Sequence, residues 1–293
     1  MNKRFLFITA NSNETEALLR DQDFFDFEVR RSSIASDNAF YNVGKFGAYD
    51  VVHFELVSQG SINPSAAILA ISDAIKAWHP DAVILVGIAF GKDNEDMPEP
   101  RQHIGDVLIS TMVADYLSGK IKDNKHEPDG LKPPSGPQLV STFKHYCTSW
   151  EHVIKGRQAK VEMGLILSGD IVVDDEDFKK VLFSYHPRAI GGEMEGRGAY
   201  SACARESIEE WIIVKAICDW GMSKSKNKQE NQIIAAESAV SLLKHIFSKP
   251  EAFDKLPVRQ RPHNNTGNDT MKKQGVEGKY TFNIKNMRDI NAN

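Results

Sequence analysis

Residues 66–91 read AAILAISDAIKAWHPDAVILVGIAFG, and this stretch decides the fold class of the chain. The apolar residues of segment 66–78 recur at helical spacing, which predicts an amphipathic helix. His79-Pro80-Asp81 ends that helix, and the fully apolar run Ala82-Val-Ile-Leu-Val-Gly87 follows as a buried strand. A helix that leads directly into a buried strand is typical of α/β proteins.

The same alternation continues along the chain. Further apolar runs of strand length and amphipathic segments of helical length predict strands at 5–10, 49–57, 107–112, 164–167 and 211–218 and helices at 14–20 and 235–247. We therefore expect α/β layers around a mostly buried sheet, in one domain over residues 1–250. Residues 251–293 are expected to form a polar linker and a tail, in which 279–284 alternates like a short strand.

Composition excludes several classes of protein. The chain has 293 residues and a net charge of −4, so a broad nucleic-acid-binding surface is not expected. No apolar run approaches the roughly 20 residues that span a bilayer, and the N-terminus does not resemble a signal peptide. The three cysteines lack metal-ligand spacing. We expect a cytoplasmic protein that needs no metal or other cofactor and binds neither membranes nor nucleic acid.

A pair of glutamates lies in Gly191-Gly-Glu-Met-Glu-Gly196, directly before a segment of helical pattern. In an extended segment, Glu193 and Glu195 project to one side and Met194 to the other. Two carboxylates beside a helix start could hydrogen-bond the hydroxyl groups of a sugar, and the glycines permit close approach of a ligand to the backbone. The pattern is equally typical of two solvated glutamates beside a helix cap.

An amine and a carboxylate interrupt the apolar run Trp211-Ile-Ile-Val-Lys-Ala-Ile-Cys-Asp219. Charged groups in a buried strand are costly unless they are paired or functional. Period-two spacing places Lys215 and Asp219 on one face, and Asp219 ends the strand where ligands bind open α/β sheets. Asp219 is therefore a candidate proton donor, although an Asp here could equally cap the next segment.

Two more signals follow predicted strands. Glu14 comes directly after the first strand, but the helix dipole favours a glutamate in a first turn whatever its function. Val86-Gly-Ile-Ala-Phe-Gly91 ends another strand, and its glycines indicate either a ligand near the backbone or a tight turn. Their spacing differs from that of dinucleotide-binding and phosphate-binding loops.

Taken in order, these motifs resemble those of the nucleoside phosphorylase/nucleosidase superfamily. The resemblance is carried by Thr9-Ala10 with Glu14, 86–91, Ile104-Gly-Asp-Val-Leu-Ile-Ser110, Leu167-Ser-Gly-Asp170, 192–196 and Val214-Lys-Ala-Ile-Cys-Asp219. Within that superfamily the chain is most similar to the methylthioadenosine/S-adenosylhomocysteine nucleosidases and to nucleosidase-like effector domains of bacterial defence proteins. The resemblance covers roughly residues 4–248 and implies a three-layer α/β/α sandwich with a central mixed sheet.

The resemblance also implies a purine N-glycosidase and a role for each motif. Asp219 would protonate N7 of the purine, Glu195 would hold a ribose hydroxyl, and Glu14 would orient or deprotonate the attacking water. Met194 would pack on the sugar. The rest of the implied substrate site is Gly87, Ile88, Val172, Val173, Glu193 and Lys215. Because cleavage passes through an oxocarbenium-like sugar, an acid at the base and anionic groups near the sugar suit this chemistry.

The chain departs from the family pattern at three positions. The nucleosidases usually carry Ser in place of Ile88, an aromatic residue in place of Val172 and Arg in place of Lys215. Loss of the aromatic residue weakens the case for base stacking, and Lys binds anions differently from Arg. The phosphate loop of the hexameric phosphorylases is not evident near the N-terminus, which favours water over phosphate as the nucleophile.

Basic residues near the expected site suggest a phosphorylated substrate. Lys92 follows the glycine turn, and Arg101 and His103 follow the acidic segment 93–100. If they converge on the site, they would bind a 5′-phosphate through charge-assisted hydrogen bonds. AMP or ATP would then be cleaved better than adenosine or methylthioadenosine. Lysines in loops are usually solvated, however, and the neighbouring acids could simply offset these charges.

Two other functions fit the same motifs. A phosphorolytic transferase would need a site for free phosphate, and a nucleotide-sensing module without turnover would have no need of both an acid and a base. The resemblance further implies a homo-oligomer, and the polar tail at 251–293 suggests contact with a protein partner.

Overall fold

The computed structural model describes residues 3–31, 39–57, 60, 67–92, 101–122, 125–222 and 227–260. Residues Met1–Arg259 form one compact unit, which extends past the expected boundary at residue 250. It does so because Phe253 and Leu256 are buried in the main apolar core. The strand expected at 279–284 and most of the expected linker lie outside the described residues.

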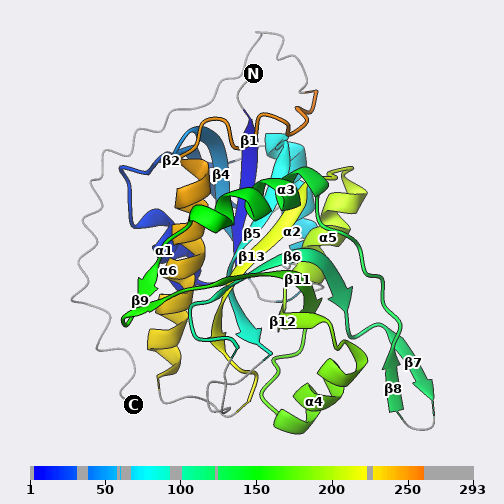
Figure 1. Ribbon diagram of the computed structural model, residues 1–293. Coiled ribbons are helices and arrows are strands. Elements are labelled where there is room, and N and C mark those ends of the chain that lie inside the picture. Colours follow the sequence, from blue (N-terminus) through cyan, green and yellow to red (C-terminus); the bar gives the residue numbers. More distant parts are fainter. Residues whose placement is uncertain are drawn as a thin grey trace, which may run out of the picture. The chain divides into compact units, whose positions relative to one another are not determined.

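A nine-stranded sheet forms the centre of this unit (Figure 1). Its order is β12 (Ala189–Glu193), β11 (Val161–Ser168), β6 (Val107–Asp115), β13 (Trp211–Asp219), β5 (Ala82–Gly91), β1 (Arg4–Thr9), β4 (Tyr49–Glu55), β3 (Phe40–Phe46) and β2 (Phe25–Arg31). β13, β5, β1 and β4 run parallel to one another, whereas β13 pairs antiparallel with β6 and β4 with β3. The prediction of a mixed sheet is therefore confirmed.

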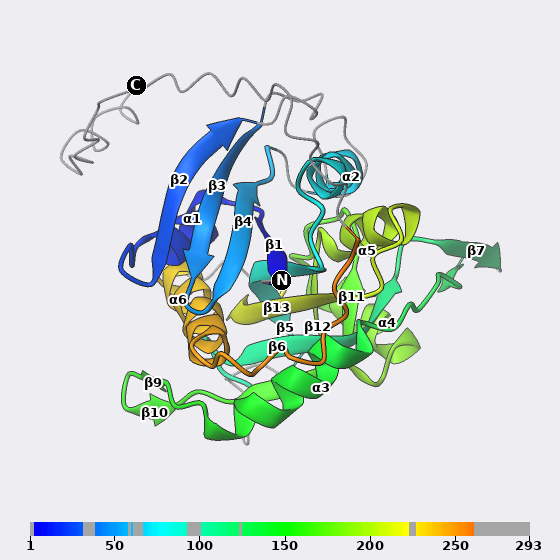
Figure 2. The same ribbon diagram turned by 90° about the horizontal axis from the view of Figure 1, so that it is seen from above.

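Helices cover both faces of the sheet, as Figure 2 shows from above. α1 (Ser12–Leu19), α3 (Pro137–Tyr146) and α6 (Lys228–Phe247) pack in one apolar core, and α2 (Ala67–Trp78) and α5 (Gly196–Arg205) pack in the other. α4 (Glu176–Tyr185) contributes to a third, smaller cluster. Small hairpins form from β7 (Gly119–Lys122) with β8 (Lys125–Pro128) and from β9 (Val153–Ile154) with β10 (Arg157–Gln158). The three-layer α/β/α prediction is confirmed.

The sheet also turns back on itself, because β12 pairs with the end of β5. Gly191 lies opposite Gly91, and Gly192 lies opposite Phe90. A Cβ atom at Gly191 would lie 2.5 Å from the carbonyl oxygen of Phe90, and one at Gly192 would lie 2.3 Å from its ring. These glycines therefore make room for the backbone and ring of Phe90. Their position beside the paired glutamates had suggested room for a ligand instead.

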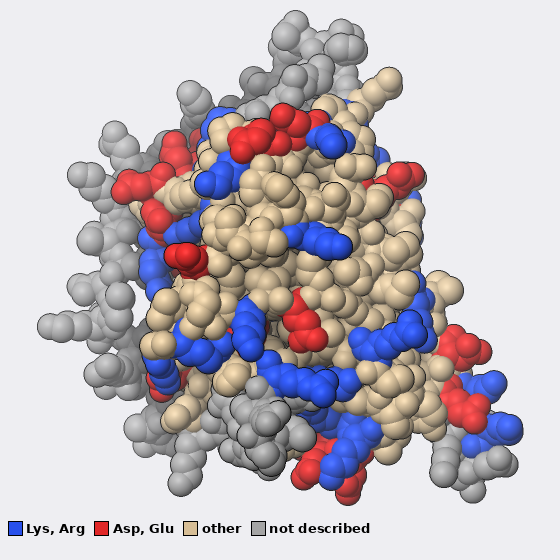
Figure 3. All heavy atoms as spheres, viewed as in Figure 1, with Lys and Arg blue, Asp and Glu red and all other residues tan. Residues whose placement is uncertain are grey.

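The surface of the described part carries both signs of charge. Figure 3 shows basic and acidic side chains interspersed on one face, with uncharged surface between them. No helix in the described ranges has the length and apolar character needed to cross a membrane.

Candidate active site

The first turn of α1 holds Glu14 in a buried position between two strands. Its Oε2 accepts a hydrogen bond from the backbone N–H of Ala10 at 2.5 Å, and its Oε1 accepts one from Ile88 at 2.9 Å. Asn11 caps the helix by accepting from the N–H of Glu14. A Cβ at Gly87 would lie only 2.1 Å from Oε1, so the glycine makes room for this carboxylate.

The lysine inside β13 is paired, as the cost of burying a charge requires. Nζ of Lys215 lies 2.7 Å from Oε2 of Glu195 and 3.2 Å from Oε2 of Glu193. Glu195 precedes α5, while Glu193 ends β12 and accepts hydrogen bonds from the backbone N–H groups of Glu195 and Gly196. The sheet and the start of α5 thus bring the two predicted glutamates and the predicted lysine together.

Glu14 belongs to the same electrostatic cluster, which holds more negative than positive groups. Burial raises the pKa of Glu14 to about 7, against the opposing effect of Lys215 and with a further rise from Glu195. Burial also raises the pKa of Glu193. The nearby carboxylates raise the pKa of Lys215 and outweigh its desolvation, so the ammonium stays charged. A carboxyl group that titrates near neutral pH is suited to exchange protons with a substrate.

Asp219 ends β13, four residues beyond Lys215 on the strand that borders β5. It is half-buried, and its Oδ1 accepts from the N–H of Gly221 at 2.9 Å. The Sγ of Cys218 lies 3.2 Å from Oδ2 and donates to it. These hydrogen bonds orient the aspartate at the end of the strand, where it is partly exposed.

The segment after β11 lies close to this strand end. Val173 is buried with Phe90 in the third cluster, and both lie within 3.4 Å of the position a Cβ at Gly221 would take. Val172 is exposed instead, at 67% of its surface. Met194, between the paired glutamates, is half-buried. Phe90, which pairs with Asp219, and Val173 thus supply apolar surface at this strand end.

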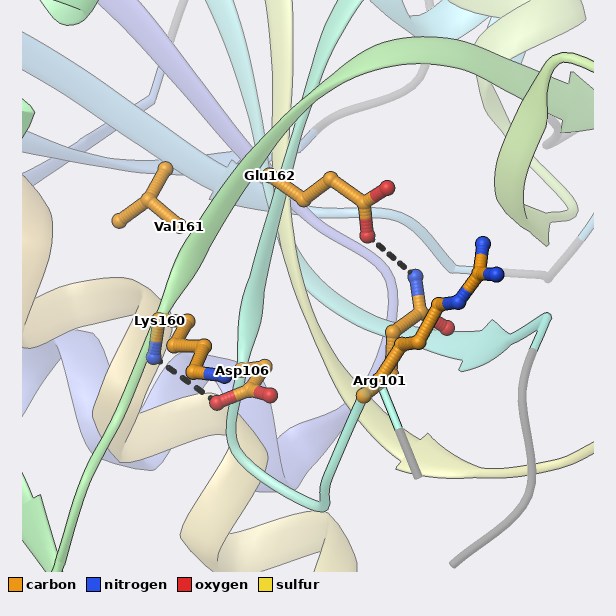
Figure 4. Close-up of a pocket in the computed structure, with 6 residues that line it drawn as sticks. Arg101, Asp106, Lys160, Val161 and Glu162 are labelled. Carbon is orange, nitrogen blue, oxygen red and sulfur yellow. Dashed lines mark hydrogen bonds between the residues drawn. The ribbon is translucent and has the colours of Figure 1, made fainter. Parts of the chain in front are cut away.

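The three basic residues expected at a 5′-phosphate have other contacts in this structure. The Nζ of Lys92 donates to the carbonyl of Pro187 at 2.7 Å. The ring of His103 lies 3.7 Å from the carboxylate of Asp106. Arg101 lines a separate small pocket of about 190 Å³, and its guanidinium points away from Asp106 (Figure 4).

The pocket of Figure 4 has a mixed lining and does not favour phosphate by itself. Its lining residues are Arg101, Gln102, Asp106, Lys160, Val161 and Glu162. Asp106 pairs with Arg157 at 2.8 Å, and Glu162 accepts a hydrogen bond from Gln102 at 2.5 Å. The carboxylates of Asp106 and Glu162 balance the charges of Arg101 and Lys160 in the lining, so the lining itself carries no excess of positive charge to attract an anion.

Some polar groups around the site were not singled out from the sequence. Ser168, which ends β11, accepts from the backbone N–H of Arg197 at 2.7 Å and hydrogen-bonds Glu193. Thr9 and His53 form a buried hydrogen bond beside the Glu14 turn. Ser168 falls within the quoted motif 167–170, but a single histidine in the strand at 49–57 carries no such signal.

Comparison with known proteins identifies the class to which this fold and cluster belong. The model of the Phosphorylase superfamily matches residues 4–248. The chain belongs to this superfamily, as its motifs predicted.

Within this superfamily, two of the relatives that the chain resembles are nucleosidases. A "death domain-containing ATP nucleosidase" from Amphimedon queenslandica is 25% identical over 268 residues, which are 83% of this chain and 48% of that protein. This chain thus spans about half the length of that relative. A 5′-methylthioadenosine/S-adenosylhomocysteine nucleosidase from Staphylococcus epidermidis is 24% identical over 208 residues, 70% of this chain and 85% of that enzyme. The predicted similarity to hydrolytic nucleosidases is confirmed.

Solved structures share the fold. The 5′-methylthioadenosine/S-adenosylhomocysteine nucleosidase of Colwellia psychrerythraea in complex with adenine superposes with a TM-score of 0.68 at 19% identity, covering 84% of this chain and 95% of that one. A futalosine hydrolase mutant of Helicobacter pylori gives a TM-score of 0.67 at 16% identity, and the match covers 83% of this chain and 98% of that one. The nucleoside phosphorylase-like fold is therefore confirmed.

Proposed function

We propose that this chain is a purine N-glycosidase, which hydrolyses the bond between adenine and ribose in a nucleoside or nucleotide. The observation that carries the proposal is the buried cluster of Glu14, Glu193, Glu195 and Lys215, whose lysine lies on the strand that ends at Asp219. The names of the relatives, all nucleosidases, support the same reaction.

In the proposed reaction, Asp219 donates a proton to N7 of the purine as the glycosidic bond breaks. The bonding electrons leave with the base, and the sugar becomes oxocarbenium-like. Glu195, held by Lys215, binds a ribose hydroxyl. Water attacks C1′ and gives its proton to Glu14, whose pKa near 7 suits a base at neutral pH. The products are free adenine and the sugar.

We propose a 5′-phosphorylated substrate such as AMP or ATP. The name of the Amphimedon queenslandica relative supports this class. Lys92, Arg101 and His103 remain candidates for the phosphates, provided that Lys92 exchanges the carbonyl of Pro187 for a phosphate oxygen when substrate binds. We also propose that the enzyme is a homo-oligomer, and that the part of the expected tail after Arg259 contacts a protein partner, as an effector would.

The test is release of free adenine, scored by chromatography, from adenosine, methylthioadenosine, AMP, ATP and NAD. We expect release from at least one adenine nucleotide, at equal rates in phosphate-free and phosphate buffers. Asp219→Asn keeps the volume of the side chain and removes the acid, so release should fall by about 10²–10⁴-fold in a folded protein. No release from any of the five compounds would overturn the proposal. A strict phosphate requirement, with ribose 1-phosphate as product, would replace it with phosphorolysis.

A further inference from the structure

A row of hydrogen-bonded polar side chains crosses the sheet beside Glu14. It begins at Asn42 of β3, whose Nδ2 lies 2.9 Å from Nδ1 of His53 in β4. The other ring nitrogen of His53, Nε2, lies 2.9 Å from Oγ1 of Thr9 in β1. That hydroxyl in turn lies 2.7 Å from Oγ1 of Thr15 in α1. The row thus joins three adjacent strands to the helix that carries Glu14.

The two hydrogen bonds of the His53 ring have a definite direction. The amide nitrogen of Asn42 can only donate, so Nδ1 of His53 accepts and the ring proton is on Nε2. Nε2–H therefore donates to Thr9, and the hydroxyls of Thr9 and Thr15 share one hydrogen bond in which either can be the donor. Burial lowers the pKa of His53 to about 3, so the ring is neutral wherever Glu14 titrates. The two hydrogen bonds of the His53 ring therefore keep their direction over that pH range.

Thr9 and Thr15 are the two ends of the turn that presents Glu14. Inside the turn, the N–H of Ala10 donates to Oε2 of Glu14, and Asn11 accepts from the N–H of Glu14. The bond between the two threonine hydroxyls closes the turn where β1 becomes α1. The closed turn restricts how far the carboxylate can move from the backbone groups that hold it.

We propose that Thr9, Thr15 and His53 form a positioning network that holds the Glu14 carboxylate in place for the attacking water. The inference rests on the proposed function, in which Glu14 takes a proton from that water. A base acts only within hydrogen-bonding distance of its proton, and a misplacement of about 1 Å can cost about a hundredfold in rate. The network also accounts for a fully buried histidine with both ring nitrogens bonded.

The decisive comparison is Thr9→Val with Thr9→Ser. Valine keeps the volume of threonine and removes the hydroxyl, whereas serine keeps the hydroxyl. We expect Thr9→Val to lower kcat by about tenfold to a hundredfold with KM changed less than about threefold, because geometry and not binding is affected. Thr9→Ser should restore most of the rate. Thr15→Val removes the other hydroxyl from a partly exposed helix position and should act in the same direction.

The pKa of Glu14 provides a measurement that does not need turnover. Titration of ¹³C-labelled glutamate by NMR should show the pKa of Glu14 shifted away from about 7 in Thr9→Val, since a looser turn changes both the burial and the backbone hydrogen bonds that set it. The matched control is Ser72→Ala, which removes a buried hydroxyl bonded to Glu206 on the α2 side. It should lower stability but leave kcat and the titration of Glu14 unchanged.

The outcomes separate the network from the reaction. If the wild type releases adenine and folded Thr9→Val keeps the wild-type kcat and Glu14 titration, the positioning network is wrong. If Thr9→Val does not fold, Thr15→Val decides by the same two measurements. If the wild type releases no adenine but the titration of Glu14 shifts in Thr9→Val, the proposed function fails and the positioning of Glu14 stands.

Discussion

The ammonium group of Lys215 is the positive charge that Glu14, Glu193 and Glu195 face inside the protein. Lys215→Met keeps an unbranched side chain of similar length and removes the charge. Because breaking a buried ion pair leaves uncompensated charge, we expect the free energy of unfolding to fall by about 3–5 kcal/mol at pH 8, measured with urea. Lys215→Arg keeps the charge and should lose less.

The loss in Lys215→Met should shrink at pH 5. Without the ammonium, the folded-state pKa values of Glu14 and Glu193 rise further above their unfolded values. The folded protein then binds more protons than the unfolded chain, so its stability increases as the pH falls. A loss of the same size at both pH values would show that lost packing, not charge, is the cause.

Glu14 makes a prediction about pH. Glu14 must be ionised to accept a proton from water, so kcat/KM should rise with pH and reach half its maximum near pH 7. Glu14→Gln should lose most of the activity, and its remaining kcat/KM should no longer fall as the pH drops below 7. For stability the sign is opposite. The pKa of Glu14 in the folded protein exceeds its ordinary value of 4.5, so the contribution of Glu14 to stability declines as the pH rises from 4.5 to about 7. A rise of kcat/KM with its midpoint near pH 4.5 would contradict the assignment of Glu14 as the base.

At the scale of residues, the sequence predicted which groups matter better than how they pair. A lysine in an apolar strand must find a partner, and Lys215 does so with Glu195 and Glu193. The partners come from strand and helix ends distant in sequence, so the sequence singled out Glu193 and Glu195 but not their pairing with Lys215. His53 gave no signal, because a polar side chain in a strand is equally typical of an exposed face, and Thr9 appeared only as part of a quoted motif.

At the scale of elements, the pairing of β12 with β5 depends on glycine. Gly191→Ala would place a Cβ 2.5 Å from the carbonyl oxygen of Phe90, and a backbone atom cannot move aside without breaking the strand pair. We expect the free energy of unfolding to fall by about 3 kcal/mol, at the upper end of the usual cost of overpacking. Urea unfolding of Gly191→Ala against the wild type measures this.

Substitution of Gly192 tests whether contact with a backbone atom, and not added volume alone, causes the loss of stability in Gly191→Ala. A Cβ there would meet the tip of the Phe90 ring, which is a side chain and can be shortened. The double variant Gly192→Ala/Phe90→Leu should therefore be more stable than Gly192→Ala alone, whereas Phe90→Leu should not rescue Gly191→Ala. Equal rescue at both positions would contradict the role assigned to the carbonyl of Phe90.

At the scale of the whole molecule, the alternation of apolar runs and amphipathic segments predicted the layers but not the strand order. Local periodicity identifies β5 and β13 as buried strands, because both read as continuous apolar runs. The antiparallel pairing of β13 with β6 and the return of β12 to β5 depend on contacts between distant segments. No local pattern encodes those contacts, so only the family resemblance led to the mixed sheet.

The outer face of α4 bears on the proposed assembly of the whole protein. Phe178, Val181 and Tyr185 recur at helical spacing, and 40%, 52% and 38% of their surfaces are exposed. The neighbouring Val172 is exposed as well. A row of large apolar side chains on one helix face is typical of a subunit interface. We therefore expect the protein to be a dimer or larger by light scattering at micromolar concentration, with this face at the contact.

Val181→Asp places a charge in the middle of that face and should shift the assembly toward monomer, since an unpaired charge is costly to bury in an interface. The matched control is Val29→Asp, on β2 at the edge of the sheet, where 60% of the valine is exposed. It introduces the same charge and should leave the molecular mass unchanged. A monomeric wild type would contradict the oligomer itself. A wild-type oligomer that Val181→Asp does not weaken, or that Val29→Asp weakens equally, would instead place the contact away from α4.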